Sequence, residues 1–140
     1  MVRKVVLAVF LLLLAAAAAW LGLSHAQSGR EKEVRTVYDL FEKAFLAGDL
    51  DAMRGLVVSE RRAEMEGEEA EMLLGLVAEL RPSDVQVRSC MVEGEKAVLT
   101  LQGRGKLEDV PVCGEVTLFR EEGAWRVGKE HWTAQRLGGP

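Results

Sequence analysis

Histidine, cysteine and tyrosine, which often work with carboxylates in acid–base and nucleophilic chemistry, are few in this 140-residue chain: two histidines, two cysteines and one tyrosine. His25 lies in an N-terminal leader that we expect to be cleaved, so histidine catalysis would have to use His131. If the last predicted strand alternates regularly, His131 shares a face with Trp125 and Lys129, whereas a bulge at Gly128 would reverse that facing. His131 and Lys129 are therefore candidate polar groups of a pocket, and the alternative is a partly exposed pair near a strand end.

Cys90 and Cys113 are the two cysteines, and an even number in an exported domain favours a disulfide. The predicted strand order conflicts with that pairing, because it puts one strand between the two residues. Their Cα atoms would then be roughly 9.6 Å apart or more, beyond the ~7 Å that a disulfide tolerates. We favour the disulfide Cys90–Cys113, which requires a different strand assignment; the alternative is that the predicted strands are right and both thiols are free.

The densest run of charge covers residues 64–72, where glutamates alternate with Met65 and Met72. It lacks the spacing of a calcium loop, and acidic residues at a helix start complement the helix dipole. We interpret the run as a solvated helix start with Met72 in the core. A zinc site built from Cys90, Cys113 and His131 lacks the usual ligand spacing, so neither a metal nor a cofactor is expected.

The first 26 residues have the pattern of an export signal. Arg3 and Lys4 precede an uncharged run over residues 5–23, and Ser24 and Ala26 have the small side chains and spacing that signal peptidase accepts. The run is longer than a usual signal core, so it is also suited to remain as a membrane anchor. Ser24 and Ala26 favour cleavage.

Both outcomes export the rest of the chain, because basic residues before an apolar run stay on the cytoplasmic side. We therefore expect a signal peptide or signal anchor over residues 1–26 and a single domain over residues 27–140, located in the periplasm or secreted. Membrane contact is expected only through residues 5–23, if they are not removed.

Length and charge exclude several classes of protein. A chain of this size holds one core, which excludes two-domain enzymes. The net charge is −4, and no stripe of lysine and arginine is present. Nucleic-acid binding is not expected, because such a stripe supplies most of the affinity for phosphates.

Helices are predicted first along the domain. Apolar residues recur at helical spacing over residues 34–45, and Ser28 with Glu31 has the capping-box spacing that marks a helix start. This helix is expected to end before Gly48, and a second is expected over residues 50–57. A third helical region is expected over residues 59–80, with an interruption at Gly67. Its apolar side consists of Met72, Leu73, Leu76, Val77 and Leu80.

After Pro82 the hydrophobic pattern changes from helical to alternating, which is typical of strands. Four strands separated by glycine-containing turns predict an antiparallel meander, and the tail over residues 137–140 is expected to fray. Helices followed by strands indicate an α+β fold in which the helices cover one face of the sheet.

Two segments carry a resemblance to a known superfamily. Residues 37–53 read VYDLFEKAFLAGDLDAM, and residues 123–127 read GAWRV. They resemble the nuclear transport factor two-like, cystatin-like cone superfamily, which includes ketosteroid isomerases, polyketide cyclases and exported bacterial domains of unknown function. The resemblance extends over residues 34–132. It implies a curved sheet that wraps the first helix into a cone, and it suggests a homodimer formed through the sheets.

Enzymes of this superfamily carry an acid–base pair inside the cone. An enolate-stabilising site would need a carboxylate base with a tyrosine or a protonated acid. Tyr38 is the only tyrosine, and no acidic residue matches the family's base, so we expect Tyr38 to be a core aromatic with its hydroxyl at a pocket edge or the surface. Tyr38 and His131 are the weak catalytic candidates. The expected pocket residues are Tyr38, Phe41, Phe45, Leu99, Leu101, Trp125, Lys129 and His131.

The sequence thus predicts an exported, non-catalytic domain that binds a small apolar ligand or an envelope protein. The alternative is an isomerase or cyclase that uses the cone interior. The two differ in the cone's content, because an interior filled with apolar side chains leaves no room for a substrate, whereas an enzyme needs an open pocket with an acid inside.

Overall fold

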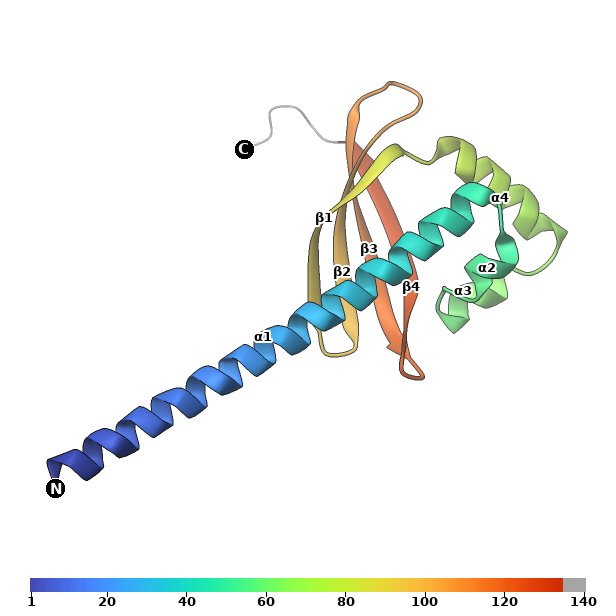
Figure 1. Cartoon of the computed structure of the whole chain (residues 1–140). Helices are drawn as coiled ribbons and strands as arrows, with labels where there is room; N and C mark the ends of the chain where they lie inside the picture. Colours follow the sequence, from blue (N-terminus) through green and yellow to red (C-terminus); the bar gives the residue numbers. More distant parts are fainter. Residues whose placement is uncertain (135–140) are drawn as a thin grey trace.

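The structure is a computed structural model that describes residues 1–134. Its first element is a single helix of 46 residues, α1 (Val2–Ala47), which leaves the sheet and runs outward to the N-terminus (Figure 1). The predicted helix start at Ser28 is wrong, because the alanine- and leucine-rich leader favours helix and no proline interrupts it before the domain. The expected frayed tail over residues 137–140 lies outside the described residues.

The predicted corner after α1 is confirmed. Gly48 has φ 67°, and its N–H donates to the carbonyl of Phe45 over 3.1 Å. Asp49 caps α2 (Leu50–Arg54) by accepting a hydrogen bond of 3.1 Å from the N–H of Ala52. α2 ends three residues earlier than predicted, because Val57 instead forms a parallel bridge with the last strand.

The third helical region is divided at Gly67, as predicted, into α3 (Ser59–Glu64) and α4 (Glu68–Leu80). The predicted inner side of α4 is wrong. The helix packs against the domain through the narrow stripe of Ala70, Leu74 and Ala78, whose small members allow close approach. Met72 is therefore 67% exposed and outside the core, and the other exposed apolar residues of α4 are Leu73, Leu76, Val77 and Leu80.

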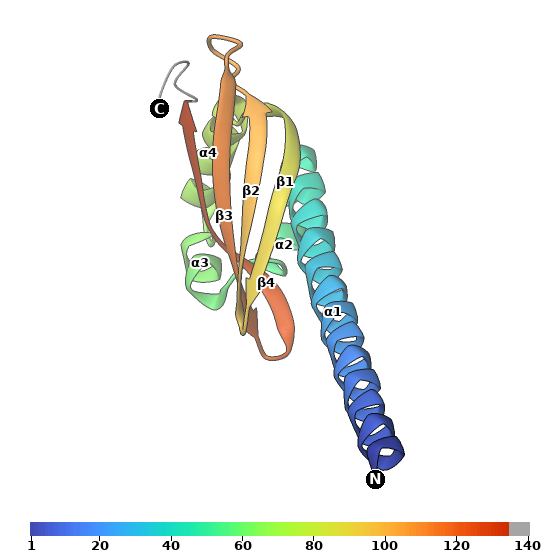
Figure 2. The same ribbon diagram turned by 90° about the vertical axis from the view of Figure 1, so that its left-hand side faces the viewer.

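Four antiparallel strands follow in the predicted meander: β1 (Ser83–Glu93), β2 (Lys96–Arg104), β3 (Pro111–Glu121) and β4 (Ala124–Ala134). The sheet curves around the second half of α1, while α2, α3 and α4 lie at the end of α1 that is far from the N-terminus (Figures 1 and 2). This arrangement confirms the α+β class and the cone shape.

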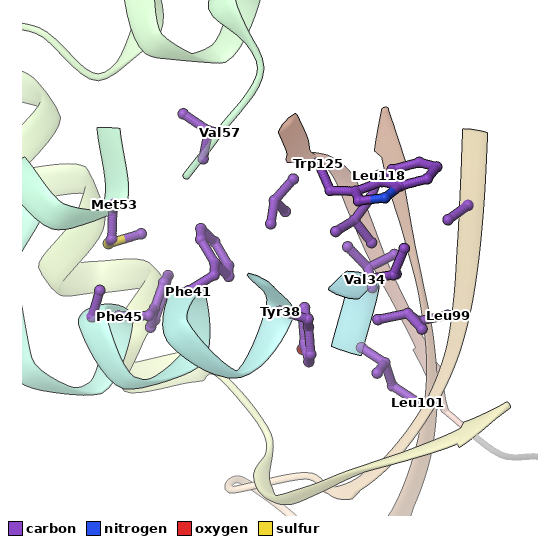
Figure 3. Close-up of a cluster of buried hydrophobic side chains, with 14 of the residues drawn as sticks. Val34, Tyr38, Phe41, Phe45, Met53, Val57, Leu99, Leu101, Leu118 and Trp125 are labelled. Carbon is purple, nitrogen blue, oxygen red and sulfur yellow. The ribbon is translucent and has the colours of Figure 1, made fainter. Parts of the chain in front are cut away.

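The core lies between α1 and the concave face of the sheet (Figure 3). On α1, Tyr38 lies beside Leu99 and Leu101 of β2, whereas Phe41 lies one turn farther along the helix, on the side of Val57 (Figure 3). All of these side chains are fully or almost fully buried. Trp125 closes one end of this cluster at 4% exposure. Most of the residues predicted to line a pocket therefore fill the interior of the cone.

A β-bulge in β4 decides which side chains of the last strand point into the cone. Leu118 of β3 pairs with Val127, but Val116 pairs with Glu130, so the bulge adds one residue to β4 between these pairs. Val116 points inward, and its partner Glu130 does too. The regular alternation that would place His131 beside Trp125 is thus broken, and His131 lies on the outer face.

The disulfide favoured by the even cysteine count does not form, and both thiols are free. Cys90 on β1 pairs with Leu99 on β2, whereas Cys113 on β3 pairs with Gln102 on β2. A whole strand and an offset of three residues along it separate the two cysteines. The strand order predicted from the alternating pattern is therefore confirmed, and the predicted disulfide is wrong.

Candidate functional site

A buried ionic cluster is centred on Arg81, the residue that follows α4. Its guanidinium is bidentate on Glu130, with Nη1 2.9 Å from Oε2 and Nη2 2.9 Å from Oε1. It also contacts the carboxylate of Glu42, where Nε lies 3.3 Å from Oε1, and it donates over 3.1 Å to the hydroxyl oxygen of Tyr38. Its carbon atom Cζ lies 4.4 Å from the ring centroid of Phe45. The side chain is only 5% exposed, so these partners replace water.

Glu130 is the common acceptor of the cluster. Besides the two bonds from Arg81, its Oε1 accepts a hydrogen bond of 3.0 Å from the Tyr38 hydroxyl and one of 3.2 Å from the indole N–H of Trp132. The side chains come from three parts of the chain. Tyr38 and Glu42 are four residues apart on one face of α1, Arg81 precedes β1, and Glu130 and Trp132 lie on β4.

A second guanidinium balances the charge of the two carboxylates. Arg61 on α3 donates to the carbonyl of Gly128 and lies with Cζ 5.9 Å from the ring centroid of Phe41. Burial lowers the pKa of Arg61, and the negative charge of Glu130 acts in the opposite direction. Arg61 and Arg81 together offset Glu42 and Glu130, so the cluster is close to neutral.

A cavity of about 480 Å³ opens beside this cluster. Arg81 and Glu130 form part of its lining, together with Phe45 from α1 and Arg61 from α3. The rest of the wall is mainly apolar and comes from α4, the β2–β3 loop and the ends of β3 and β4. These apolar residues are Val77, Leu80, Pro82, Leu107, Val110, Val112 and Trp132.

The volume is typical of a small-molecule site, as is a mainly apolar lining with a few convergent polar groups. Among residues 1–134, no three His, Cys, Asp or Glu side chains gather in a way that would hold a metal ion. The geometry is thus suited to binding a small organic molecule in a cavity that is open to solvent on one side.

The structure brings six of the eight predicted pocket residues together in the buried core, but not around the cavity. Only Phe45 of that set lines the cavity. The Tyr38 side chain is 1% exposed, so its hydroxyl lies beneath the cavity and not at the predicted edge or surface. His131 and Lys129 are exposed and line a second hollow beside α3, which shares Arg61 and Glu130 with the first cavity.

Sequence reasoning missed Glu42, Arg81 and Glu130. One signal for Glu42 was available, because it lies four residues after Tyr38 on the core-facing side of the first helix. Nothing in the sequence marked Arg81, which directly precedes Pro82, as a buried charge. The sequence alone did not indicate that Glu130 points inward, because the direction of its side chain depends on the bulge in β4.

The cluster predicts an unusual alkaline titration of Tyr38. Burial, and after it the charges of Glu130 and Glu42, raise the pKa of Tyr38 far above its usual value near 10, against the opposing charge of Arg81. The folded protein therefore keeps this proton at pH values where the unfolded chain loses it, and the free energy of unfolding falls as the pH rises above about 10.

Because Tyr38 is the only tyrosine, tyrosinate absorbance reports on it alone. We expect this absorbance to appear together with the loss of the circular dichroism signal. In Tyr38→Phe, stability should depend less steeply on pH above 10. Tyrosinate formation in a chain with an intact dichroism spectrum would contradict the expectation.

A curved antiparallel sheet wrapped around a long helix, with a cavity on its concave side, defines the cone fold of the nuclear transport factor two-like proteins. Solved structures confirm this fold. The chain is similar to a nuclear transport factor 2 superfamily protein from Salmonella enterica, with a TM-score of 0.55 and 12% identity over 80% of this chain and 95% of that one.

Two further similar structures are proteins of unknown function described as NTF2-like. One is from Silicibacter pomeroyi, with a TM-score of 0.54 and 13% identity over 77% of this chain and 98% of that one. The other is from Pseudomonas putida, with a TM-score of 0.53 and 16% identity over 77% and 88%. No family model and no curated protein matches the chain. These likenesses establish the fold, and a fold does not determine a function.

Proposed function

We propose that this protein is an exported, non-catalytic domain that binds a small, neutral, largely apolar molecule in the cavity beside Arg81. The observation that carries the proposal is the lining itself, in which apolar walls surround buried charges that already neutralise one another. Arg81 is already paired with both carboxylates, and together with Arg61 the four charged groups of the cluster sum to zero. Lys106 and Glu108, the other charged residues of the lining, also offset each other. The cavity therefore has no net charge to attract a charged ligand, whereas a neutral apolar molecule gains by leaving water.

The hydrogen bonds of Glu130 favour binding over catalysis. A general base needs a carboxylate oxygen that can accept a proton from the substrate. Both oxygens of Glu130 already accept from Arg81, and Oε1 also accepts from Tyr38 and Trp132. An isomerase or cyclase would use Tyr38 and His131 as a pair. Tyr38 lies on the concave side of the sheet, whereas His131 lies on its outer face.

The N-terminal part of α1 supports export. It is long and apolar enough to cross a membrane, and none of its most apolar window is buried against the domain. Gln27 follows the expected cleavage site and hydrogen-bonds to the carbonyl of Val92 over 3.2 Å, so contact with the sheet is already present there. A chain released after Ala26 would keep the whole core, which begins at Val34.

The test is the intact mass of the protein recovered from the cell envelope, recorded under native and denaturing non-reducing conditions. We expect a passenger of small-molecule mass in the native spectrum, and a denatured mass that corresponds to either the whole exported chain or residues 27–140. Val110→Trp places a bulky side chain at the cavity wall and should expel the passenger.

Leu73→Gln is the matched control, because it changes an apolar residue of α4 that is exposed and does not line the cavity. The passenger should survive this change. A bare protein in every sample, or loss of the passenger in Leu73→Gln with retention in Val110→Trp, would overturn the proposal.

A further inference from the structure

The indole of Trp132 lies flat against the inner face of the sheet. A Cβ atom added at Gly114 would lie 2.7 Å from Cδ2, 2.7 Å from Cε3 and 2.9 Å from Cε2 of this ring. These atoms are consecutive in the ring, and nearly equal distances to all three place Gly114 beneath the ring face. Trp132 and Gly114 are also direct cross-strand partners on β4 and β3.

A second glycine lets the ring extend across the sheet. A Cβ atom added at Gly103 on β2 would lie 3.5 Å from Cη2 of Trp132. The indole thus reaches from β4 over β3 toward β2, on a strip of backbone without side chains. Any larger residue at Gly114 would lift the ring, because the contact is far shorter than an ordinary carbon–carbon contact.

The cluster around Arg81 holds the ring in this orientation. The only polar atom of the indole, Nε1, donates to Glu130, which is itself fixed by the bidentate bonds from Arg81. With one ring face against glycine backbone and the N–H occupied, Trp132 presents its other aromatic face to the cavity that it lines. Leu80 and Leu107, from α4 and the β2–β3 loop, contribute apolar wall to the same cavity.

We propose that Trp132 is a stacking platform and that the cavity selects a molecule with a flat, uncharged ring system. This inference rests on the proposed function, because it names the class of ligand for the same cavity. An apolar wall of flexible side chains would accept any shape of suitable size. A fixed aromatic face instead favours a planar ring, which can stack in an offset arrangement.

The test compares naphthalene with decalin, which has the same carbon skeleton but is saturated and puckered. The full-length chain, labelled with fluorotryptophan, is placed in lipid nanodiscs and titrated with each probe while fluorine NMR follows the three tryptophans. Trp132→Phe assigns the resonance. Trp20 in the leader reports probe that only enters the lipid, and Trp125 reports changes in the closed core.

We expect naphthalene to shift the Trp132 resonance with an affinity about 3- to 10-fold higher than that of decalin. A merely apolar cavity would bind decalin at least as well, because decalin buries at least as much apolar surface as naphthalene. If the two probes bind equally at Trp132, the stacking inference is overturned and the proposed function stands. If neither probe moves the Trp132 resonance, the proposed function fails as well.

Gly114→Ala tests the geometry directly, because its methyl group must displace the indole from the sheet. The preference for naphthalene should disappear in this variant and remain in Gly75→Ala, a glycine of α4 whose added Cβ meets nothing within 4 Å. A preference that persists in folded Gly114→Ala would contradict the platform. The comparison of probes on the unmodified chain decides the inference if Gly114→Ala does not fold.

Discussion

Replacing Arg81 with methionine is expected to lower the free energy of unfolding by about 3–5 kcal/mol, because it leaves two carboxylates without their cation. Glu130 and Glu42 are 9% and 18% exposed at their side chains, so water replaces little of what the guanidinium provides. The Tyr38 hydroxyl loses a donor in the same step. Urea denaturation followed by circular dichroism measures the change.

Arg104→Met is the matched control, because the pair of Arg104 and Asp109 is exposed on the surface. It should leave the urea midpoint unchanged within error. Part of the lost stability should be recovered when the two unpaired carboxylates are removed as well. We therefore expect the triple variant Arg81→Met, Glu130→Leu, Glu42→Leu to be more stable than Arg81→Met alone. If Arg81→Met behaves like Arg104→Met, the cluster does not contribute to stability as its burial implies.

Gly128→Ala is expected to lower the free energy of unfolding by about 1–3 kcal/mol, because the added methyl group has no room at the bulge. We also expect it to weaken ligand binding in the cavity. A Cβ atom at this position would lie 2.8 Å from the carbonyl oxygen of Thr117 and 2.9 Å from Cε2 of Phe119. Since the oxygen belongs to the backbone, relief requires the strand to move. Glu130 and Trp132 follow directly after the bulge, so their inward facing depends on it.

Gly75→Ala is again the control, since alanine is favoured over glycine within a helix and space is available. It should be as stable as the unmodified chain or slightly more stable. The second readout is naphthalene binding at Trp132, which should weaken in Gly128→Ala beyond the change in stability. Wild-type stability and binding in Gly128→Ala would show that the bulge does not set the register of the site.

Arg81→Met and Gly128→Ala separate two contributions to the site, the ionic cluster and the bulge in β4. Arg81 joins α1 to β4 across the floor of the cavity, so its loss affects the whole domain. Gly128 acts on the facing of β4 alone. A binding defect larger than the stability defect is therefore expected for Gly128→Ala, and the reverse for Arg81→Met.

The elements themselves were determined by local signals in the sequence. Gly48 and Asp49 end one helix and begin the next within two residues, and Gly67 and Pro82 interrupt or end helices through their own backbone restrictions. The alternating pattern after Pro82 then specified four strands in a meander. Each of these inferences needs only neighbours along the chain, and together they were enough to indicate the α+β class. The cone shape was expected from the resemblance to a known superfamily.

Interactions between segments decided what the local pattern left open. Five apolar residues of α4 predicted an inner side that the helix does not bury, because the domain accepts the narrower stripe of Ala70, Leu74 and Ala78. The cysteine count favoured a disulfide, but the order of the strands puts β2 between the two thiols.

The candidate site was decided almost wholly by tertiary structure. Glu42, Arg81 and Glu130 lie far apart in sequence, and they form one cluster only where α1, the start of β1 and β4 converge. Of the three, only Glu42 had a sequence signal, its place on the core-facing side of the first helix. A single extra residue in β4 then turns Glu130 and Trp132 inward and His131 outward. Side chains alternate between the two faces of a strand, so one inserted residue moves every later side chain to the opposite face. Only the pairing with β3 shows where that insertion lies.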